Sequence, residues 1–179
     1  MSKRLLLDAG NTRLKWAVVE GGMWREQGGA AYTDLPALAP MLEAGIDCCI
    51  ASVAREQHEN QISALLAPFA ITPRWLTAEA HQLGVRSSYA NPQQLGVDRW
   101  MGLLAARQRT QEPTLVVSVG TAMTLDALSA DGVFLGGLIV PGVSLMRQAL
   151  RQGTAGIAEA SGTWQAFPAT TADGVESGI

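Results

Sequence analysis

The chain has 179 residues, 47% of them hydrophobic, and a formal net charge of −3. This length fits one domain or two small ones. The charges are spread without a block of lysine and arginine, which argues against a nucleic-acid partner. No apolar run approaches the ~20 residues that cross a bilayer. Only three leucines precede Asp8, too few for a signal peptide. We therefore expect a cytoplasmic protein with no nucleic-acid or membrane partner.

The only two cysteines, Cys48 and Cys49, are adjacent in an apolar run. Neighbours on a strand point to opposite faces, so a disulfide between them is not expected. We interpret them as buried, reduced thiols. His58 and His81 are isolated from each other and from the cysteines, so the sequence predicts surface histidines and no zinc site.

Apolar runs and turn residues predict a mixed α/β protein. Strands are predicted at Arg4–Asp8 and Leu14–Glu20, joined by a hairpin-like loop with Gly10 in the turn. The elements predicted next are a helix over Asp34–Glu43, a strand over Ile46–Val53, a helix over Arg55–Phe69, a strand over Ile71–Leu76, a loop over Val85–Pro92 and a helix over Leu95–Gln108.

The rest of the chain is predicted to hold more strands and another helix. The predicted elements are strands over Thr114–Val119, Thr121–Leu128 and Val133–Val140, a break at Pro141-Gly142, a helix over Ser144–Arg151 and a helix beginning at about Thr171. The boundary between two halves is expected near 111–113, which gives an N-terminal half of residues 1–112 and a C-terminal half of 113–179.

Two short stretches share one design, Asp8–Lys15 and Ser118–Thr124. Each follows an apolar strand and turns at a glycine that is followed closely by a threonine. Glycine lets the backbone approach a ligand, and a pair of such turns can hold a nucleotide phosphate from two sides. The likeness between them also suggests two similar halves. For the first stretch alone, an ordinary hairpin turn is an equally good interpretation.

The residue types in and around these turns suit a nucleotide. Asp8 can hold a magnesium ion through water, and Lys15 can reach a phosphate as a point charge. Thr12 or Thr121 can donate a hydroxyl to phosphate oxygens. Neither G-x-x-x-x-G-K-[ST] nor a G-x-G-x-x-G after a strand is present.

Asp98 lies at the start of a predicted helix, beside Arg99. One interpretation is an Asp that caps the helix or offsets its dipole. The other is a carboxylate that orients or deprotonates an attacking hydroxyl, with Arg99 gripping a substrate carboxylate in a bidentate fork.

Four motifs together carry a family resemblance. They are Asp8–Lys15 against D-x-G-N-T-x-x-K, Gly96–Arg99 against G-A-D-R, Ser118–Asp126 against D-F-G-T-A-T-T-x-D, and Gly136–Gly142 against G-G-x-I-x-P-G. In order and spacing the chain resembles the type III pantothenate kinases from about Arg4 onward. The resemblance implies an α/β fold of two ribonuclease-H-like halves, of the actin, hexokinase and Hsp70 superfamily.

The resemblance also implies a reaction and its partners. ATP would phosphorylate the primary hydroxyl of pantothenate, in the first step towards coenzyme A, with Mg²⁺ and a monovalent cation such as K⁺ or NH₄⁺. The protein would be a homodimer. The implied catalytic base is Asp98. The implied ATP-binding residues are Asp8, Ala9, Gly10, Asn11, Thr12, Arg13, Leu14, Lys15, Gly120 and Thr121. The implied pantothenate-binding residues are Tyr89, Gly96, Val97, Asp98, Arg99 and Thr171.

The chain departs from the family pattern at three positions. Val97 replaces the usual alanine, and Met123 replaces the first threonine of a pair. Ser118 stands where many relatives have an aspartate that helps to bind the monovalent cation, and a neutral hydroxyl is a weaker ligand. Family members also continue past Ile179, so the second half is expected to be incomplete and to leave apolar strand faces over Thr114–Val140 uncovered.

Two other functions stay open from the sequence. One is a non-catalytic accessory or regulatory factor of the same fold. The other is another small-molecule kinase or phosphatase of the actin-like superfamily, which a substrate panel would reveal.

Overall fold

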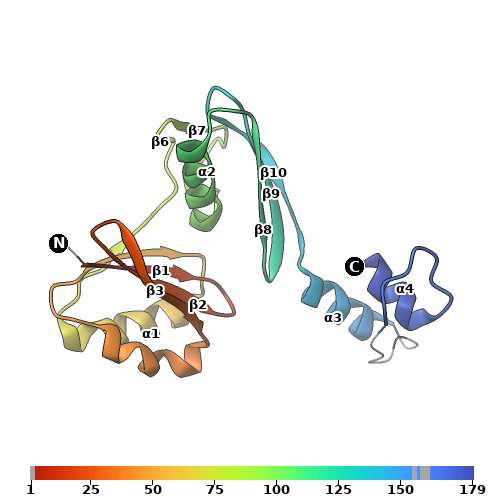
Figure 1. Cartoon of the computed structure of the whole chain (residues 1–179), viewed down its shortest axis with the longest axis horizontal. Helices are drawn as coiled ribbons and strands as arrows, with labels where there is room; N and C mark the ends of the chain where they lie inside the picture. Colours follow the sequence, from red (N-terminus) through yellow and green to blue (C-terminus); the bar gives the residue numbers. More distant parts are fainter. Residues whose placement is uncertain (1–2, 155–156, 158–161) are drawn as a thin grey trace. The chain divides into compact units, whose positions relative to one another are not determined.

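The computed structural model describes residues 3–154, 157 and 162–179 (Figure 1). The chain divides into two compact units, one of Met1–Thr114 with Ala127–Gly136 and one of Leu115–Asp126 with Gly137–Ile179. The division of the fold into halves at residues 112 and 113 stays a prediction. Among the described residues, no helix has the length and apolarity that a membrane span requires.

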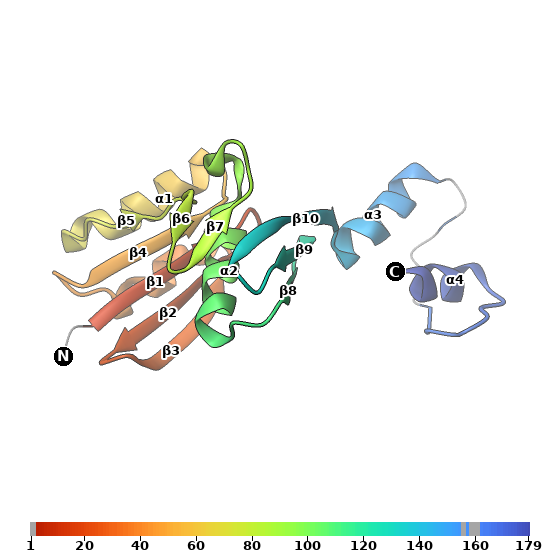
Figure 2. The ribbon, with the colours of Figure 1, turned by 90° about the horizontal axis from the view of Figure 1, so that it is seen from above.

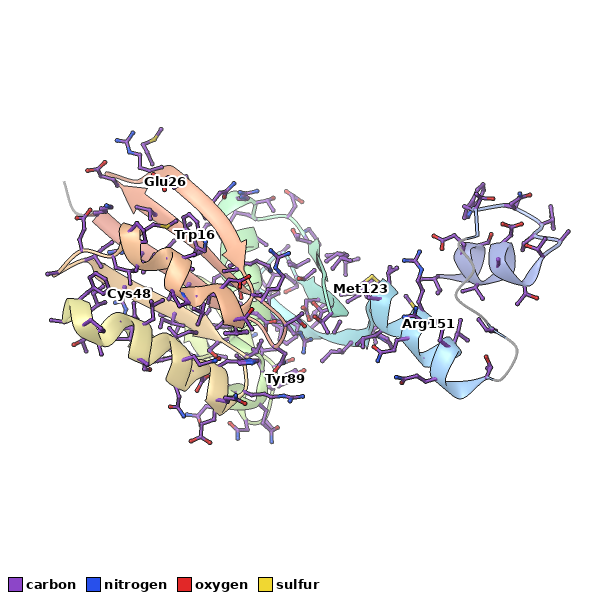
Figure 3. All side chains as sticks on the ribbon, turned by 90° about the horizontal axis from the view of Figure 1, so that it is seen from below. Trp16, Glu26, Cys48, Tyr89, Met123 and Arg151 are labelled. Carbon is purple, nitrogen blue, oxygen red and sulfur yellow. The ribbon has the colours of Figure 1, made fainter. Side chains whose placement is uncertain are left out.

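A five-stranded sheet forms the centre of the first unit, in the order β3-β2-β1-β4-β5 (Figure 2). Its strands are β1 (Lys3–Ala9), β2 (Leu14–Glu20), β3 (Met23–Ala30), β4 (Asp47–Ser52) and β5 (Arg74–Trp75). β1 is antiparallel to β2 and parallel to β4. The predicted hairpin of β1 and β2 is confirmed. β3 was not predicted, because it is exposed and lacks an apolar face; Figure 3 shows Glu26 at the outer edge of the sheet.

Helices accompany this sheet. The segment η1 (Tyr32–Met41) is a 3₁₀ helix and not the predicted α-helix. Pro36 and Pro40 lie inside it, and each removes a backbone donor that a regular α-helix would use. The next predicted helix is confirmed as α1 (Glu56–Leu66), followed by the short η2 (Ala67–Phe69).

Apolar side chains of β1, β2, β4, η1 and α1 form the core of the first unit. Cys48 and Cys49 are buried and unpaired, as predicted. Burial raises the pKa of the Cys48 thiol from 9.0 to about 12, and the neighbouring Cys49 and Asp47 add to this shift. The core therefore holds a neutral thiol at physiological pH.

The predicted loop over Val85–Pro92 is wrong at its start. Val85–Ser87 forms β7, which pairs with β6 (His81–Gln82) and with Val133 and Phe134 of β10 (Val133–Pro141). These strands are too short to show an alternating pattern, so pairing alone reveals them. The short η3 (Pro92–Gln94) follows, and then α2 (Val97–Arg109) confirms the predicted helix.

The remaining strands and helices agree closely with the predictions. They are β8 (Thr114–Val119), β9 (Ala122–Leu128), β10 (Val133–Pro141), α3 (Val143–Gly153) and α4 (Thr171–Gly178). The second sheet has the order β6-β7-β10-β9-β8. The expected exposure of apolar strand residues is observed at Leu115, Val117, Val119, Leu138 and Ile139.

Candidate functional site

The first glycine turn connects β1 to β2. Asp8 and Lys15 are directly opposite each other in the antiparallel register, and the Lys15 ammonium lies 3.1 Å from an Asp8 carboxylate oxygen. The Gly10 N–H donates to the Arg13 carbonyl at 3.2 Å and closes the turn. Both charged side chains remain accessible to solvent, so an exposed ion pair lies at the edge of the turn.

Buried neighbours anchor this turn to the core. Ala9 and Leu14 are fully buried on either side of it, whereas Asn11, Thr12 and Arg13 are exposed. Ala9 and Leu14 therefore belong to the packed core, and the surface of the turn is formed by Asn11, Thr12 and Arg13.

The turn lies beside the end of β4. Ala9 pairs with Ser52 in the parallel register, and the Ala9 carbonyl accepts the Val53 N–H at 3.0 Å. Gly96 packs against the same residue, because a Cβ at position 96 would lie 3.6 Å from Val53 Cγ1. The structure thus brings two of the predicted site segments, Asp8–Lys15 and Gly96–Arg99, to one edge of the first unit.

Asp98 occupies the first turn of α2 and is exposed. Its Oδ1 accepts the backbone N–H of Arg99 at 2.8 Å, while the N-cap residue is Gly96. A Cβ at Gly96 would lie 2.6 Å from Asp98 Oδ1, so a side chain at position 96 would push this carboxylate away. The helix N-terminus favours the negative charge of Asp98.

Arg99 and Tyr89 form an aromatic and cationic cluster with Phe134. The Arg99 guanidinium donates to the Tyr89 hydroxyl at 3.4 Å and lies 5.8 Å from the centre of the Phe134 ring. The Tyr89 and Phe134 rings are 5.5 Å apart (Tyr89 is labelled in Figure 3). Arg99 is 92% buried, so the protein, and not solvent, sets its orientation, with Tyr89 and Phe134 among its contacts.

The second glycine turn connects β8 to β9. The Gly120 N–H donates to the Ala122 carbonyl at 3.0 Å, and Ser118 and Thr121 are exposed. Gly142 packs directly against the turn, and its N–H donates to the Thr121 carbonyl at 2.9 Å. A Cβ at position 142 would lie 2.0 Å from the Gly120 carbonyl oxygen. Part of the G-G-x-I-x-P-G motif therefore supports the second turn.

Thr171 is the first residue of α4 and is exposed. The preceding Thr170 caps the helix by accepting the Asp173 N–H. Hydrogen bonds from the Thr163 backbone and from the Thr170 hydroxyl lower the pKa of Asp173. The helix is tied to α3 by Arg147, which donates to both carboxylate oxygens of Glu176 at 2.6 and 2.7 Å.

A group of residues that belongs to none of the motifs contacts the first turn. The Tyr32 hydroxyl donates to the Gly10 carbonyl at 2.6 Å, and the Tyr32 ring stacks on His58. His58 was expected at the surface, but its ring is partly covered and its Nδ1 is buried without a hydrogen-bond partner. No motif contains these residues, and only the packing of η1 and α1 against the sheet brings them to the turn.

The oxygen donors present fit magnesium better than a dedicated monovalent-cation site. Asp8 is an accessible carboxylate, and Mg²⁺ commonly binds one or two carboxylates together with substrate phosphates and waters. The described residues contain no group of three or more acidic, histidine or cysteine side chains suited to a metal. Ser118 supplies one neutral hydroxyl, which does not by itself make a cation site.

The sequence of the chain matches one family model and several enzymes of that family. The family model described as type III pantothenate kinase matches residues 4–179. A type III pantothenate kinase of Thiobacillus denitrificans is 59% identical over 98% of this chain and 72% of its own length. One of Nitrosomonas eutropha is 44% identical, over 98% of this chain and 70% of its own length.

Structure comparisons support the fold class. A putative Baf family transcriptional activator from Campylobacter jejuni aligns with a TM-score of 0.61 at 18% identity, over 98% of this chain and 73% of that one. A putative 2-dehydro-3-deoxygalactonokinase from Sinorhizobium meliloti aligns with a TM-score of 0.54 at 15% identity, over 85% of this chain and 58% of that one. At these identities the likeness shows the fold alone, and the predicted fold class is confirmed.

Proposed function

The chain belongs to the type III pantothenate kinase family, and on this premise we propose which of its residues carry out the reaction. The enzyme is an ATP-dependent kinase that transfers the γ-phosphate of ATP to the primary hydroxyl of pantothenate and yields 4'-phosphopantothenate. Our assignment rests on one observation: the first glycine turn and the Gly96–Arg99 segment both contact Val53, just after the end of β4.

ATP binds through Asp8–Lys15, with Gly120 and Thr121 as further contacts. Asp8 and Lys15 neutralise each other at 3.1 Å before the nucleotide arrives. A bound phosphate would take over the Lys15 charge, and Asp8 is the residue that would hold Mg²⁺, through water. The ion would supply positive charge to the phosphate oxygens, and the exposed turn supplies backbone N–H groups. Phosphoryl transfer depends chiefly on such positioning and charge stabilisation.

Asp98 is the general base of this proposal. Its exposed carboxylate at the start of α2 accepts the proton of the pantothenate hydroxyl as that oxygen attacks the γ-phosphate. The bond to the Arg99 N–H fixes the direction of one carboxylate oxygen. The structural interpretation of Asp98, a carboxylate bonded to the first turn of its helix, is compatible with this role.

Pantothenate is held by Tyr89, by Gly96–Arg99 and by Thr171 in our proposal. The Arg99 guanidinium, oriented by Tyr89 and Phe134, supplies the positive charge that the pantothenate carboxylate requires. The acceptor is thus recognised by the helix that also carries the base.

Three finer predictions accompany this assignment. We propose a homodimer, supported by the exposed apolar residues Leu115, Val117 and Val119 of β8. A requirement for K⁺ or NH₄⁺ stays a prediction, and no step above depends on Ser118. The cytoplasmic location also stays a prediction. The alternatives, an accessory factor or another small-molecule kinase or phosphatase, have less support. The pantothenate kinase family model matches residues 4–179, and a pantothenate kinase aligns over 98% of this chain.

The test is pantothenate-dependent formation of ADP from ATP and Mg²⁺, with and without K⁺. We expect Asp98→Asn to lower kcat by about 10²–10⁴-fold, the usual contribution of a general base. Asp34→Asn is the matched control, because Asp34 is also an exposed first-turn aspartate, in η1. Wild-type protein that phosphorylates a sugar but not pantothenate, or an Asp98→Asn variant with full kcat, would refute the proposal.

A further inference from the structure

The Tyr32 side chain contacts the proposed nucleotide-binding turn from behind. Its hydroxyl donates to the Gly10 carbonyl at 2.6 Å, a short and strong hydrogen bond. Tyr32 itself opens η1 and packs against the core of the first unit. A residue of η1, outside the turn, therefore sets the orientation of a peptide group inside the turn.

His58 and its neighbours keep this tyrosine in place. The Tyr32 and His58 rings are 3.6 Å apart and inclined by only 7°, so they stack face to face. Next to His58, Glu59 accepts the Ser52 hydroxyl at 2.6 Å, which ties the first turn of α1 to the end of β4. The stack is thus anchored to the same strand end that meets Ala9 and Gly96.

The orientation of one peptide group has a direct chemical consequence. All described peptide bonds are trans, and in a planar trans peptide the C=O and the N–H of the following residue point in opposite directions. A Gly10 carbonyl held by Tyr32 therefore turns the Asn11 N–H away from Tyr32. Asn11 is exposed in the turn, where an N–H can reach a phosphate oxygen.

We propose that Tyr32, stacked on His58, is a positioning residue that orients the Asn11 N–H toward the ATP phosphates. The proposal rests on the assignment of Asp8–Lys15 as the nucleotide-binding turn. Tyr32 and His58 do not touch the nucleotide and act through the Gly10–Asn11 peptide.

The surroundings of Tyr32 keep its hydroxyl a donor. Burial raises the pKa of Tyr32, and the carboxylates of Asp8 and Glu59 raise it further. The hydroxyl therefore keeps its proton throughout the physiological range, and the bond to Gly10 persists there. The arrangement is a constant support and not a pH switch.

The test compares Tyr32→Phe with Thr33→Val. The first substitution removes the hydroxyl and keeps the stacking ring, and the second removes the neighbouring hydroxyl, which bonds Asp34 and not the turn. We expect Tyr32→Phe to weaken MgADP binding and to raise the KM for ATP about threefold to tenfold, as for one lost hydrogen bond. The KM for pantothenate should change less than twofold, and Thr33→Val should match the wild type.

Two variants at His58 test the stack. His58→Ala removes it and should raise the KM for ATP as Tyr32→Phe does, whereas His58→Phe keeps an aromatic ring and should behave as wild type. The double variant Tyr32→Phe/His58→Ala should be no weaker in MgADP binding than the worse single variant, because both act through one peptide. Unchanged ATP constants with a lowered Tm would show a merely structural role and overturn the proposal.

Lys15→Ala separates this proposal from its premise. If Lys15→Ala and Tyr32→Phe both leave MgADP binding unchanged, the assignment of the turn is wrong. If Lys15→Ala weakens binding and Tyr32→Phe does not, the turn stands and the role of Tyr32 is refuted.

Discussion

The two glycine turns resemble each other in sequence but are supported differently. In the first, the Gly10 carbonyl accepts a hydrogen bond from a side chain, that of Tyr32. In the second, the Thr121 carbonyl accepts one from a backbone N–H, that of Gly142. The first support depends on a hydroxyl and a stacked ring, whereas the second depends on the absence of a side chain.

This difference predicts different responses to mutation. A side-chain support can be weakened in small steps, since a hydroxyl or a ring can be removed while the backbone stays in place. The close backbone contact at Gly142 cannot be weakened in small steps, because even a methyl group at this position would collide with a carbonyl oxygen. A glycine-to-alanine substitution, which adds a single methyl group, should therefore destabilise the protein to different extents at the two turns.

The largest expected effect comes from adding that methyl group at the second turn. A Cβ at Gly142 would lie 2.0 Å from the Gly120 oxygen, whereas a Cβ at Gly10 would lie 3.3 Å from the Arg13 oxygen. We expect Gly142→Ala to lower the free energy of unfolding by about 3 kcal/mol and Gly10→Ala by less than about 1 kcal/mol. Urea melts, with hydrogen exchange at each turn, measure both, and equal costs would contradict the comparison.

Alkaline pH should weaken the core beneath the first turn. The pKa of Cys48 is raised from 9.0 to about 12, so the unfolded chain loses the thiol proton first and stability falls as pH rises from about 9 to 12. At pH 10 the loss is on the order of 1 kcal/mol relative to pH 8. Cys48→Ala should lose less stability over the same interval, and an identical pH dependence in the variant would show that another group is responsible.

The smallest effect concerns α4, which carries Thr171, and it appears in acid. The pKa of Asp173 is lowered by hydrogen bonds, so its contribution is present above the unfolded value of about 3.9 and is lost as pH falls through the lower folded value. Asp173→Asn should speed hydrogen exchange of the Thr163 amide, which donates to the Asp173 carboxylate at 2.8 Å, at pH 7. The difference between the variant and the wild type should shrink as pH falls below the unfolded value, and a difference that does not change with pH would contradict this explanation.

The sequence predicted the two turns and most regular elements because their information is local. Apolar runs beside Gly10 and Gly120 mark strand ends, and the helix over Val97–Arg109 has a clear apolar face. The strand β3 was missed because only its pairing with β2 makes it a strand. A helix was predicted where η1 lies, but Pro36 and Pro40 inside it favour the 3₁₀ type, which was not predicted.

The residues that support the turns, Tyr32 and Gly142, were not predicted because their contacts are tertiary. Tyr32 is 22 residues from Gly10, and the contact exists only because η1 folds against the sheet. His58 and Glu59 reach the same place through α1. Such tertiary contacts leave no local pattern, whereas Gly142 could be suspected because it belongs to a motif, although its target, the second turn, could not.

We propose a division of labour at one edge of the first unit, in which the Asp8–Lys15 turn binds the nucleotide and Asp98 activates the acceptor. The most direct test measures the MgADP dissociation constant and kcat for Asp98→Asn and Lys15→Ala together. We predict that Asp98→Asn keeps the wild-type affinity and loses turnover, whereas Lys15→Ala weakens the affinity. An Asp98→Asn variant that loses nucleotide binding as severely as turnover, or a Lys15→Ala variant with unchanged affinity, would contradict the claim.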